Sequence, residues 1–316
     1  MTAAILRRLT LSVLALLGAG LVIFLATEAL PGDAAMAVLG KEATGEKLEA
    51  MRREMGLDQP LALRFFDWMG DVVRGDLGTS ITTRQPAWDL IGPALGNSLA
   101  LGVLAVIFTV PLAVLLGIAT GVRRGSTLDN VVAGLSLAML SLPEFVIGIL
   151  LAVLFGILWP LFPATSLLLP GDSLIEQVNQ LILPALAAGG VSGGYILRMA
   201  RISTIEVLDS EYVNAAQLRG VGGVRLIRRH VLRNALIPVV NVIGVNVAWM
   251  FGSLVVIEAV FGFPGIGNLL IQSIRSADSV LVADVAIIIT FVYVVVNLLA
   301  DFTVLLLNPR IRGTQG

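Results

Sequence analysis

A polar, basic segment between residues 198 and 238 carries the most informative combination of side chains in the sequence. Its seven arginines are Arg198, Arg201, Arg219, Arg225, Arg228, Arg229 and Arg233, and its acids are Glu206, Asp209 and Glu211. Gly220 and the pair Gly222-Gly223 break two short helical patterns, because glycine permits turns that a side chain obstructs. Ala215 and Ala216 give the first pattern a small face that another backbone can approach. The segment predicts a helical hairpin for a soluble docking partner; an ordinary basic loop is the plainer alternative.

Hydroxyl and acidic side chains indicate where this hairpin begins. Ser203 and Glu206 have the spacing of a capping box, and Asp209 and Ser210 are N-cap candidates for the first short helix. His230 is the single histidine, and the chain has no cysteine. Disulfides and thiolate metal sites are therefore impossible, and a hydrogen bond within the hairpin is a better prediction for His230 than metal ligation.

Motifs that carry catalytic chemistry are absent from the sequence. There is no Gly-x-x-x-x-Gly-Lys-Ser/Thr string to cradle phosphates, no Ser-His-Asp context and no His-Glu-x-x-His pair. We therefore expect no catalytic residue, no bound cofactor and no metal site, and we expect no ATP hydrolysis by this chain alone.

Composition identifies the elements that must position the hairpin. The chain is 57% apolar with a mean hydropathy of +0.92, which indicates an all-α polytopic membrane protein. A helix needs about 20 apolar residues to cross a bilayer. Six stretches qualify, roughly 9–30, 97–122, 131–161, 181–200, 238–260 and 281–307. The first is too long for the core of a cleavable signal peptide, so we expect it to remain as an anchor.

The distribution of arginines predicts the orientation of these spans. If the N-terminus is cytoplasmic, the inside segments hold thirteen arginines, and the two short outside loops hold only Arg275. Both termini are therefore expected in the cytoplasm. The predicted organisation is an N-terminal region with the first span (1–30), an extracytoplasmic helical segment (31–94), a transmembrane domain (95–307) that includes the hairpin loop 203–236, and a cytoplasmic tail (308–316).

The segment 31–94 shows two short amphipathic patterns. Leu48, Met51 and Met55 recur at helical spacing in the first, and Leu61, Phe65, Met69 and Val72 do so in the second. Such helices either rest on the membrane surface as a cap or form a platform for an extracellular partner.

Several residues within the apolar stretches restrict how the spans pack. Glycines at 117 and 121, at 189 and 193, and at 190 and 194 have GxxxG spacing, which favours close packing within the chain over a homodimer seam. Pro111 and Pro143 are expected to kink their spans or to free main-chain carbonyls. Glu258 and Asp284 are placed near the outer surface, where hydration favours a structural role.

Five strings in order along the chain carry a resemblance to a known family. They are Gly56-Leu-Asp-Gln-Pro-Leu61, Gly75-Asp-Leu-Gly-Thr-Ser80, Ala215-Ala-x-x-x-Gly220 with His230-Val-Leu-Arg-Asn-Ala235, Glu258-x-x-Phe-x-x-Pro-Gly-x-Gly267, and Asn308-Pro-Arg-Ile-Arg312. Together they resemble the permeases of ABC importers for dipeptides, oligopeptides and nickel, over roughly residues 5–312. Arg233 stands where the general pattern of the coupling loop has proline, and this departure matches the peptide and nickel branch.

The resemblance implies a fold, partners and roles for individual residues. The fold is that of a type I ABC-importer permease with six transmembrane helices, in the cytoplasmic (inner) membrane of a prokaryote, and the chain is the first permease of a pair. Partners are a second related permease, two ATPase subunits that carry ATP and Mg, and an extracytoplasmic solute-binding protein, with no nucleic acid. The residues implied for ATPase coupling are Glu211, Tyr212, Ala215, Ala216, Gly220 and His230.

Glu144 and Pro143 are the candidates for the translocation pathway. Thirteen residues from Val131 at about 1.5 Å each place Glu144 roughly 20 Å into the bilayer, where a charge facing lipid is costly. One hypothesis is a contact for a cationic group such as a peptide's N-terminal amine. The alternative is a protonated or hydrogen-bonded acid that holds spans together.

Two other classes of protein are weighed against the importer permease. A secondary transporter driven by an ion gradient would show inverted halves with interrupted helices, and no clear repeat of that kind is visible. An intramembrane enzyme would need a nucleophile and base at depth, and no span contains a histidine. Peptides are the expected solute, with nickel, glutathione or sugar-like solutes as alternatives.

Overall fold

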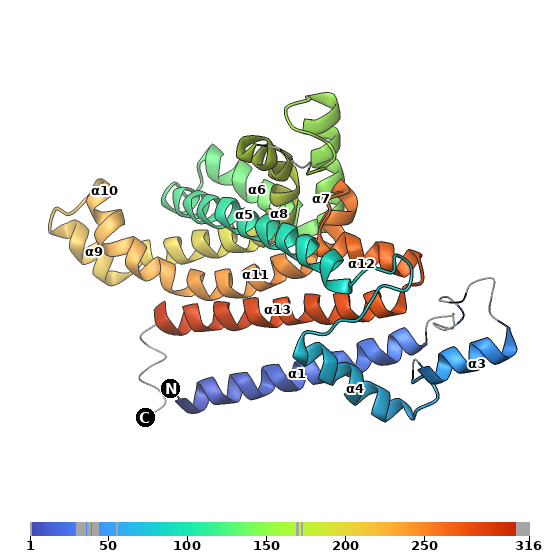
Figure 1. Cartoon of the computed structure of the whole chain (residues 1–316). Helices are drawn as coiled ribbons and strands as arrows, with labels where there is room; N and C mark the ends of the chain where they lie inside the picture. The colour runs from blue at the N-terminus through green and yellow to red at the C-terminus, as the bar shows by residue number, and fades with distance from the viewer. Residues whose placement is uncertain are drawn as a thin grey trace. The chain divides into compact units, whose positions relative to one another are not determined.

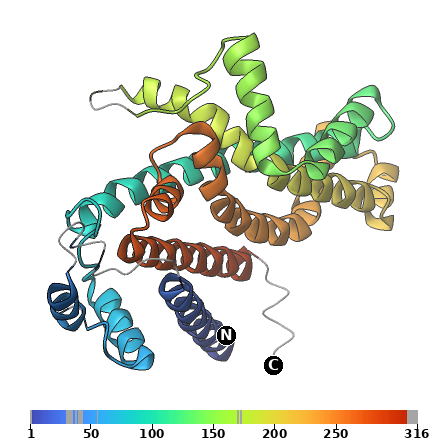
Figure 2. The same ribbon diagram turned by 90° about the vertical axis from the view of Figure 1, so that its right-hand side faces the viewer.

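A computed structural model describes residues 2–29, 36, 39, 44–54, 56–168, 171 and 173–307 of the chain, and these residues are almost entirely helical (Figures 1 and 2). Within them there is no strand, only one isolated bridge between Thr79 and Pro86. The helices are α1 (Thr2–Glu28), α3 (Gly45–Glu54), α4 (Leu61–Arg74), α5 (Ala87–Val122), α6 (Thr127–Ser141), α7 (Glu144–Leu151), η2 (Ala152–Leu158), α8 (Leu174–Leu208), α9 (Glu211–Leu218), α10 (Gly223–Leu226), η3 (Ile227–Val231), α11 (Leu232–Phe261), α12 (Ile266–Arg275) and α13 (Ser279–Leu307). The predicted tail 308–316 and most of residues 30–43 lie outside the described part.

The long apolar helices correspond to the predicted spans. Among the described residues, five helices are long and apolar enough to cross a membrane: α1, α5, α8, the run of α10, η3 and α11, and α13. A sixth span results if α6 and the α7–η2 segment are counted together. The predicted all-α class is therefore confirmed, and the six predicted apolar stretches correspond to these five helices and the bent pair.

The predicted third span, 131–161, is not one continuous helix. It divides into α6 and α7–η2, which meet at an angle of 116°. Pro143 disfavours a helical conformation at the preceding residue, and Leu142 is accordingly extended (φ −106°, ψ 139°). Pro111, by contrast, lies inside the uninterrupted helix α5, so only one of the two predicted kinks is a break.

One compact unit comprises residues 1–98 and 264–294. In it α4 packs against α1 through an aromatic cluster of Phe24, Phe65 and Trp68, and Met69 closes on Gly20. Arg64 of α4 holds Glu28 of α1 by two contacts. Phe65 and Met69 of the predicted amphipathic face therefore pack within this unit, whereas Leu61 is 52% exposed.

Asp284 of α13 lies in the same unit and is only 2% exposed. Its Oδ1 accepts a hydrogen bond from Trp68 Nε1 at 3.1 Å, which ties α13 to α4. The expectation of a hydrated position is therefore wrong for the described residues, although the contact is of the expected structural kind. Glu258 in the second unit is also fully buried, because it lies on the packed face of α11.

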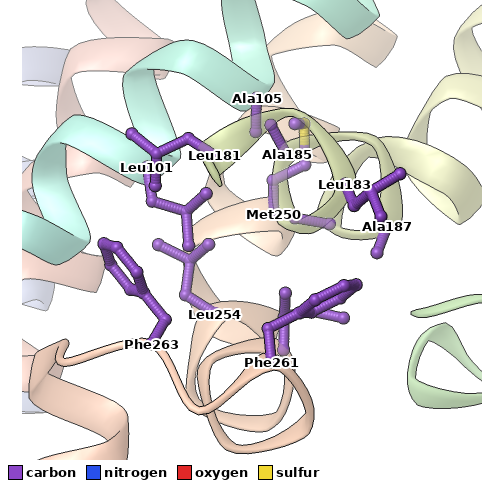
Figure 3. Packing of buried hydrophobic residues seen from close by; sticks show 12 residues of the cluster. Leu101, Ala105, Leu181, Leu183, Ala185, Ala187, Met250, Leu254, Phe261 and Phe263 are labelled. Carbon is purple, nitrogen blue, oxygen red and sulfur yellow. The ribbon is translucent and has the colours of Figure 1, made fainter. Parts of the chain in front are cut away.

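The second unit comprises residues 99–263 and 295–316 and is organised around α8, which packs on α6, α7 and α11. Its core contains Leu101 and Ala105 of α5, Leu183 of α8, and Met250 and Phe261 of α11 (Figure 3). Such a core requires helices that approach closely, and small residues on α5 and α8 permit it.

Glycines at GxxxG spacing make these close approaches. A Cβ on Gly117 would lie 2.5 Å from the carbonyl oxygen of Leu197, and one on Gly121 would lie 2.7 Å from Cβ of Thr204. Gly189 and Gly193 of α8 face Thr109 of α5 in the same way. The prediction of packing within the chain is confirmed at these positions.

Candidate functional site

The predicted hairpin is present, with shorter boundaries than the sequence indicated. The long helix α8 continues to Leu208 and α11 begins at Leu232, so the hairpin proper is residues 209–231. Gly220 (φ +84°) and Gly223 (φ +57°) adopt the left-handed conformation that glycine tolerates, as expected of the turn. We call residues 209–231, with α9, α10 and η3, the coupling hairpin, after the role that the family resemblance implies for it.

Ser203 does not cap a helix, so the predicted capping box with Glu206 is wrong. Ser203 is buried inside α8, and its hydroxyl donates to the carbonyl of Ala235 on α11 at 2.9 Å. This bond joins the two long helices at the base of the hairpin. Ser210 does occupy the N-cap position of α9, but its hydroxyl donates back to Val207 instead of capping the helix.

A small apolar core holds the coupling hairpin together. It contains Val213 and Ala216 of α9, Leu226 of α10, Val231 of η3 and Ala235 of α11, with Val207, Leu208 and Val221 packed against it. Val213 and Val231 are fully buried. Because the same core includes residues at the ends of α8 and α11, the hairpin and these two helices form one packed body. Ala216 faces inward, whereas its neighbour Ala215 is exposed.

Tyr212 and His230 are brought together across the hairpin. The Tyr212 hydroxyl donates to the His230 main-chain carbonyl at 3.2 Å and accepts from Asn234 Nδ2 at 2.8 Å. His230 belongs to the π-helical turn η3, where the wider backbone hydrogen bonding differs from that of the α-helix that follows. This contact involves the main-chain carbonyl of His230, so the hydrogen bond predicted for its side chain stays a prediction.

The outer surface of the hairpin combines apolar and basic side chains. Leu218 at the end of α9 is 90% exposed and Val224 of α10 is 69% exposed. Exposed arginines flank them: Arg219, Arg225, Arg228 and Arg229. Glu211, Ala215 and Gly220 are exposed on the same hairpin. Apolar patches rimmed by charged side chains mark contact sites for other proteins, so Leu218 and Val224 are candidates for such a contact.

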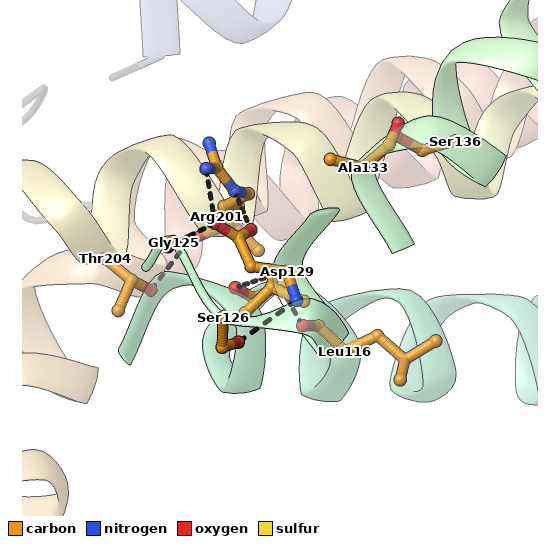
Figure 4. A network of polar contacts seen from close by, with 11 residues as sticks. Leu116, Gly125, Ser126, Asp129, Ala133, Ser136, Arg201 and Thr204 are labelled. Atoms are coloured by element: carbon orange, nitrogen blue, oxygen red, sulfur yellow. Dashed lines mark hydrogen bonds and ion pairs between the residues drawn. The ribbon is translucent and has the colours of Figure 1, made fainter. Parts of the chain in front are cut away.

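Arg201 is not part of that surface, because it is paired with Asp129 (Figure 4). Arg201 Nε donates to Asp129 Oδ1 at 2.5 Å and its Nη2 to Oδ2 at 2.9 Å. Gly125 N–H donates to Oδ2 at 2.9 Å, and Ser126 caps α6 by accepting from Asp129 N–H at 3.2 Å. Sequence reasoning missed this network; the available signal was the capping residue Ser126 three positions before an acid.

Pro143 and Glu144 lie at the break between α6 and α7. Pro143 is the N-cap residue of α7 and Glu144 is its first residue. The Glu144 carboxyl group is partly buried and approaches Ser253 and Trp249 of α11. Its Oε1 is buried and has no hydrogen-bond partner among the described residues. The two pathway candidates are therefore together, at a position next to α11 and far along the chain from the coupling hairpin.

Comparison with known families identifies the class to which this architecture belongs. The model of the family "binding-protein-dependent transport system inner membrane component" matches residues 113–313, and the model of its N-terminal part matches residues 1–102. The chain belongs to this family. It is thus a membrane-spanning permease component of a transport system, and the predicted permease class is confirmed.

Individual relatives match along nearly their entire length. The probable peptide ABC transporter permease protein y4tP of Sinorhizobium fredii is 34% identical over 308 residues, 98% of each chain. A putative peptide transport system permease protein of Brucella abortus is 34% identical over 312 residues, 99% of each chain. The dipeptide transport system permease protein DppB of Escherichia coli K12 is 32% identical over 332 residues, 98% of each chain.

Proposed function

We propose that this chain is one of two permease subunits in an ATP-driven importer of dipeptides or short oligopeptides. Peptides are proposed as the solute because the names of the full-length relatives each refer to peptide or dipeptide transport. The coupling hairpin carries the choice of mechanism, because it joins an exposed docking surface to two long helices through one buried core.

Two ATPase subunits are the partners proposed for the cytoplasmic side. The chain has no phosphate-binding loop, so ATP and Mg belong to those subunits. Leu218 and Val224 would insert into an apolar recess of the ATPase, and the surrounding arginines would contact acidic residues at its rim. The pair of apolar side chains anchors the contact, and the charges orient it.

ATP-driven closure of the ATPases would displace the coupling hairpin as a rigid body. The hairpin core includes Val207 and Leu208 at the end of α8 and Ala235 in α11. The Ser203 to Ala235 hydrogen bond makes the same connection. Displacement of the hairpin would therefore move α8 and α11 together, which provides a two-state element that ATP and solute both bias.

The remaining partners lie in and across the membrane. A second, related permease would complete the pathway, and a solute-binding protein would deliver peptide on the outer side. Both termini are proposed to be cytoplasmic, which places α3 and α4 with the outer partner. No role for nucleic acid is proposed.

Reconstitution tests this function directly. The complete complex, with both permeases, both ATPases and the binding protein, is placed in proteoliposomes, and uptake of radiolabelled dialanine is measured with and without ATP. We expect uptake that requires ATP, and no ATPase activity from this chain alone. Uptake of nickel or glutathione but not dipeptides would overturn the choice of solute. Uptake driven by an ion gradient without ATP would overturn the importer mechanism.

A further inference from the structure

Glu144 and Trp249 place a carboxylate beside an exposed indole within the membrane-spanning part of the chain. The Glu144 carboxyl group approaches Ser253 and Trp249 of α11. Ser253 lies eight residues before the end of α11 at Phe261, which is about 12 Å along a helix with a rise of 1.5 Å per residue. If α11 ends at the bilayer surface, as the predicted topology has it, Glu144 lies well inside the bilayer, where a carboxylate that faces lipid is expensive.

The hydrogen bonds around Glu144 leave it short of a donor. The Ser253 hydroxyl has a single proton, which it donates either to the carbonyl of Met250 at 2.9 Å or to the Glu144 carboxyl group. The Trp249 indole has one N–H to offer, and Oε1 of Glu144 is buried without any partner among the described residues. An ionised carboxyl group therefore has few donors here among the described residues, and a charged donor at its other oxygen compensates it best.

The indole adds a second recognition element for a cation. Trp249 is 62% exposed although it lies in the middle of an apolar helix. The face of an indole ring attracts ammonium groups, and tryptophan is the best of the aromatic residues in this role. A carboxylate and an indole side by side therefore favour a ligand with a positively charged nitrogen.

The first turn of α7 is held rigidly, which a binding site requires. Ile147 is buried and packs against Gly190 of α8, where a Cβ would lie 3.1 Å from its Cδ1. Gly148 faces Phe261 of α11 at 3.3 Å by the same measure. These contacts fix the direction in which Glu144 leaves the helix, so the carboxylate is positioned before a ligand arrives.

We propose that Glu144 and Trp249 bind the ammonium group of the transported solute, which for a peptide is its N-terminal amine. The carboxylate would accept hydrogen bonds from the ammonium while the indole face contacts it. This inference rests on the proposed function, since it assigns a contact to the solute that the importer carries.

The test uses a thiol beside the site and omits the binding protein, whose own selectivity would confuse the result. Phe145 adjoins Glu144 and is exposed, and the native chain has no cysteine, so a Phe145→Cys variant reports on this chain alone. The purified permease–ATPase complex is treated with a water-soluble maleimide, both without nucleotide and trapped with ATP and vanadate. Dialanine and N-acetyl-dialanine are then compared as protecting ligands.

We expect labelling of the introduced thiol at position 145 in at least one nucleotide state, with protection by dialanine and much weaker protection by its acetylated form. Glu144→Gln should raise the dialanine concentration for half-protection by about tenfold or more, because a charge-assisted hydrogen bond is lost. Glu144→Asp should raise this concentration by less than Glu144→Gln does. Trp249→Leu should raise it more than Trp249→Phe, which keeps an aromatic ring. Glu49→Gln, an exposed charge removal in α3, serves as the matched control and should have no effect.

Equal protection by the two peptides, or equal protection in the Glu144→Gln variant, would overturn the site. A thiol at position 145 that is labelled in neither nucleotide state would also overturn it, because an ammonium site must be open to water. These outcomes are separable from failure of the proposed function. If the Glu144→Gln complex imports dialanine like the native complex, the importer stands and the site fails, whereas a native complex that imports no peptide rejects the function itself.

Discussion

Asp129 and Arg201 form a two-point ion pair that joins the start of α6 to α8, with distances of 2.5 and 2.9 Å. Asp129 is 2% exposed, whereas the Arg201 side chain is 26% exposed, so the acid is the buried member of the pair. Arg201 lies seven residues before the end of α8 at Leu208, where the coupling hairpin begins. The pair therefore fixes the position of the α5–α6 connection relative to the helix that carries the hairpin.

Removal of one partner should destabilise the protein strongly. Asp129→Asn leaves a guanidinium without its counter-ion; loss of one member of a buried pair costs about 3–5 kcal/mol, which is an upper limit here because the Arg201 side chain is 26% exposed to water. We expect a lower midpoint of thermal unfolding in detergent, with partial recovery in the double variant Asp129→Arg with Arg201→Asp. Asp209→Asn is the control, because it breaks the exposed contact of Asp209 with Arg124 and should change little. Equal effects of the two single variants would contradict the structural role.

A second prediction concerns the close approach of α5 to α8. Gly117→Ala would place a Cβ 2.5 Å from a main-chain carbonyl oxygen, which cannot move away as a flexible side chain would. We expect a loss of about 1–3 kcal/mol, as for overpacking in a core, visible as a lower unfolding midpoint. Gly134→Ala in α6 is the control, since a Cβ there meets no atom within 4 Å. If the two variants unfold alike, the helices do not approach as closely as described.

Long apolar runs and paired glycines were sufficient to predict the spans and the turn of the hairpin. Bilayer thickness sets the length of a span, and a left-handed turn favours glycine at Gly220 wherever the chain lies. These are local constraints, so one sequence contains them. The proline at 143 likewise predicted a kink, but the 116° angle depends on how α7 packs against α8 and α11.

Contacts between residues distant in sequence could not be predicted in the same way. Asp129 and Arg201 are 72 positions apart, and nothing in either local context identifies the other as its partner. Ser203 has the spacing of a helix cap, yet a neighbouring helix supplies an acceptor, the Ala235 carbonyl, and α8 continues through it. Burial of Asp284 depends in the same way on the packing of α4 against α13, which brings Trp68 to it.

The proposed orientation of the chain can be tested directly by thiol labelling. The native chain has no cysteine, so any label on this chain must be at an introduced cysteine. Gly45→Cys and Gly222→Cys are suitable, since a side chain at either position meets no atom within 4 Å. We expect a membrane-impermeant maleimide to label the thiol at position 45 in intact cells and the thiol at position 222 only after permeabilisation. The reverse pattern would invert the topology and exclude the proposed docking of ATPases.

Tyr212 should stabilise the π-helical turn of the coupling hairpin. Tyr212→Phe removes both the bond to the His230 carbonyl and the one from Asn234, at about 1 kcal/mol for each hydrogen bond. We expect faster amide hydrogen exchange across residues 227–235, measured by mass spectrometry on the assembled complex. Tyr195→Phe, an exposed position in α8, is the control. Unchanged exchange in η3 would show that the hydroxyl does not hold this turn.

Gly220 and Gly222 offer a matched pair that separates backbone conformation from available space. Neither position has an atom within 4 Å of an added Cβ, but Gly220 is left-handed (φ +84°) and Gly222 is extended (φ −136°). Gly220→Val should therefore cost about 1–2 kcal/mol in backbone strain, because a β-branched residue disfavours that conformation. The strain would shift α9 relative to α10 and misplace Leu218 and Val224 at the proposed ATPase contact.

The expected result for Gly220→Val is normal membrane insertion with reduced binding of the ATPases, or with loss of the ATPase stimulation that loaded binding protein causes. Gly222→Ala should bind and stimulate like the native complex, because alanine accepts an extended backbone and has room. Both are measured on reconstituted complexes, by co-purification of the ATPases and by phosphate release. If Gly220→Val binds and stimulates the ATPases like the native complex, the conformation of the turn does not determine the docking surface. If Gly222→Ala loses ATPase binding or stimulation to the same extent as Gly220→Val, the cause is side-chain bulk at the hairpin tip and not the φ angle of residue 220.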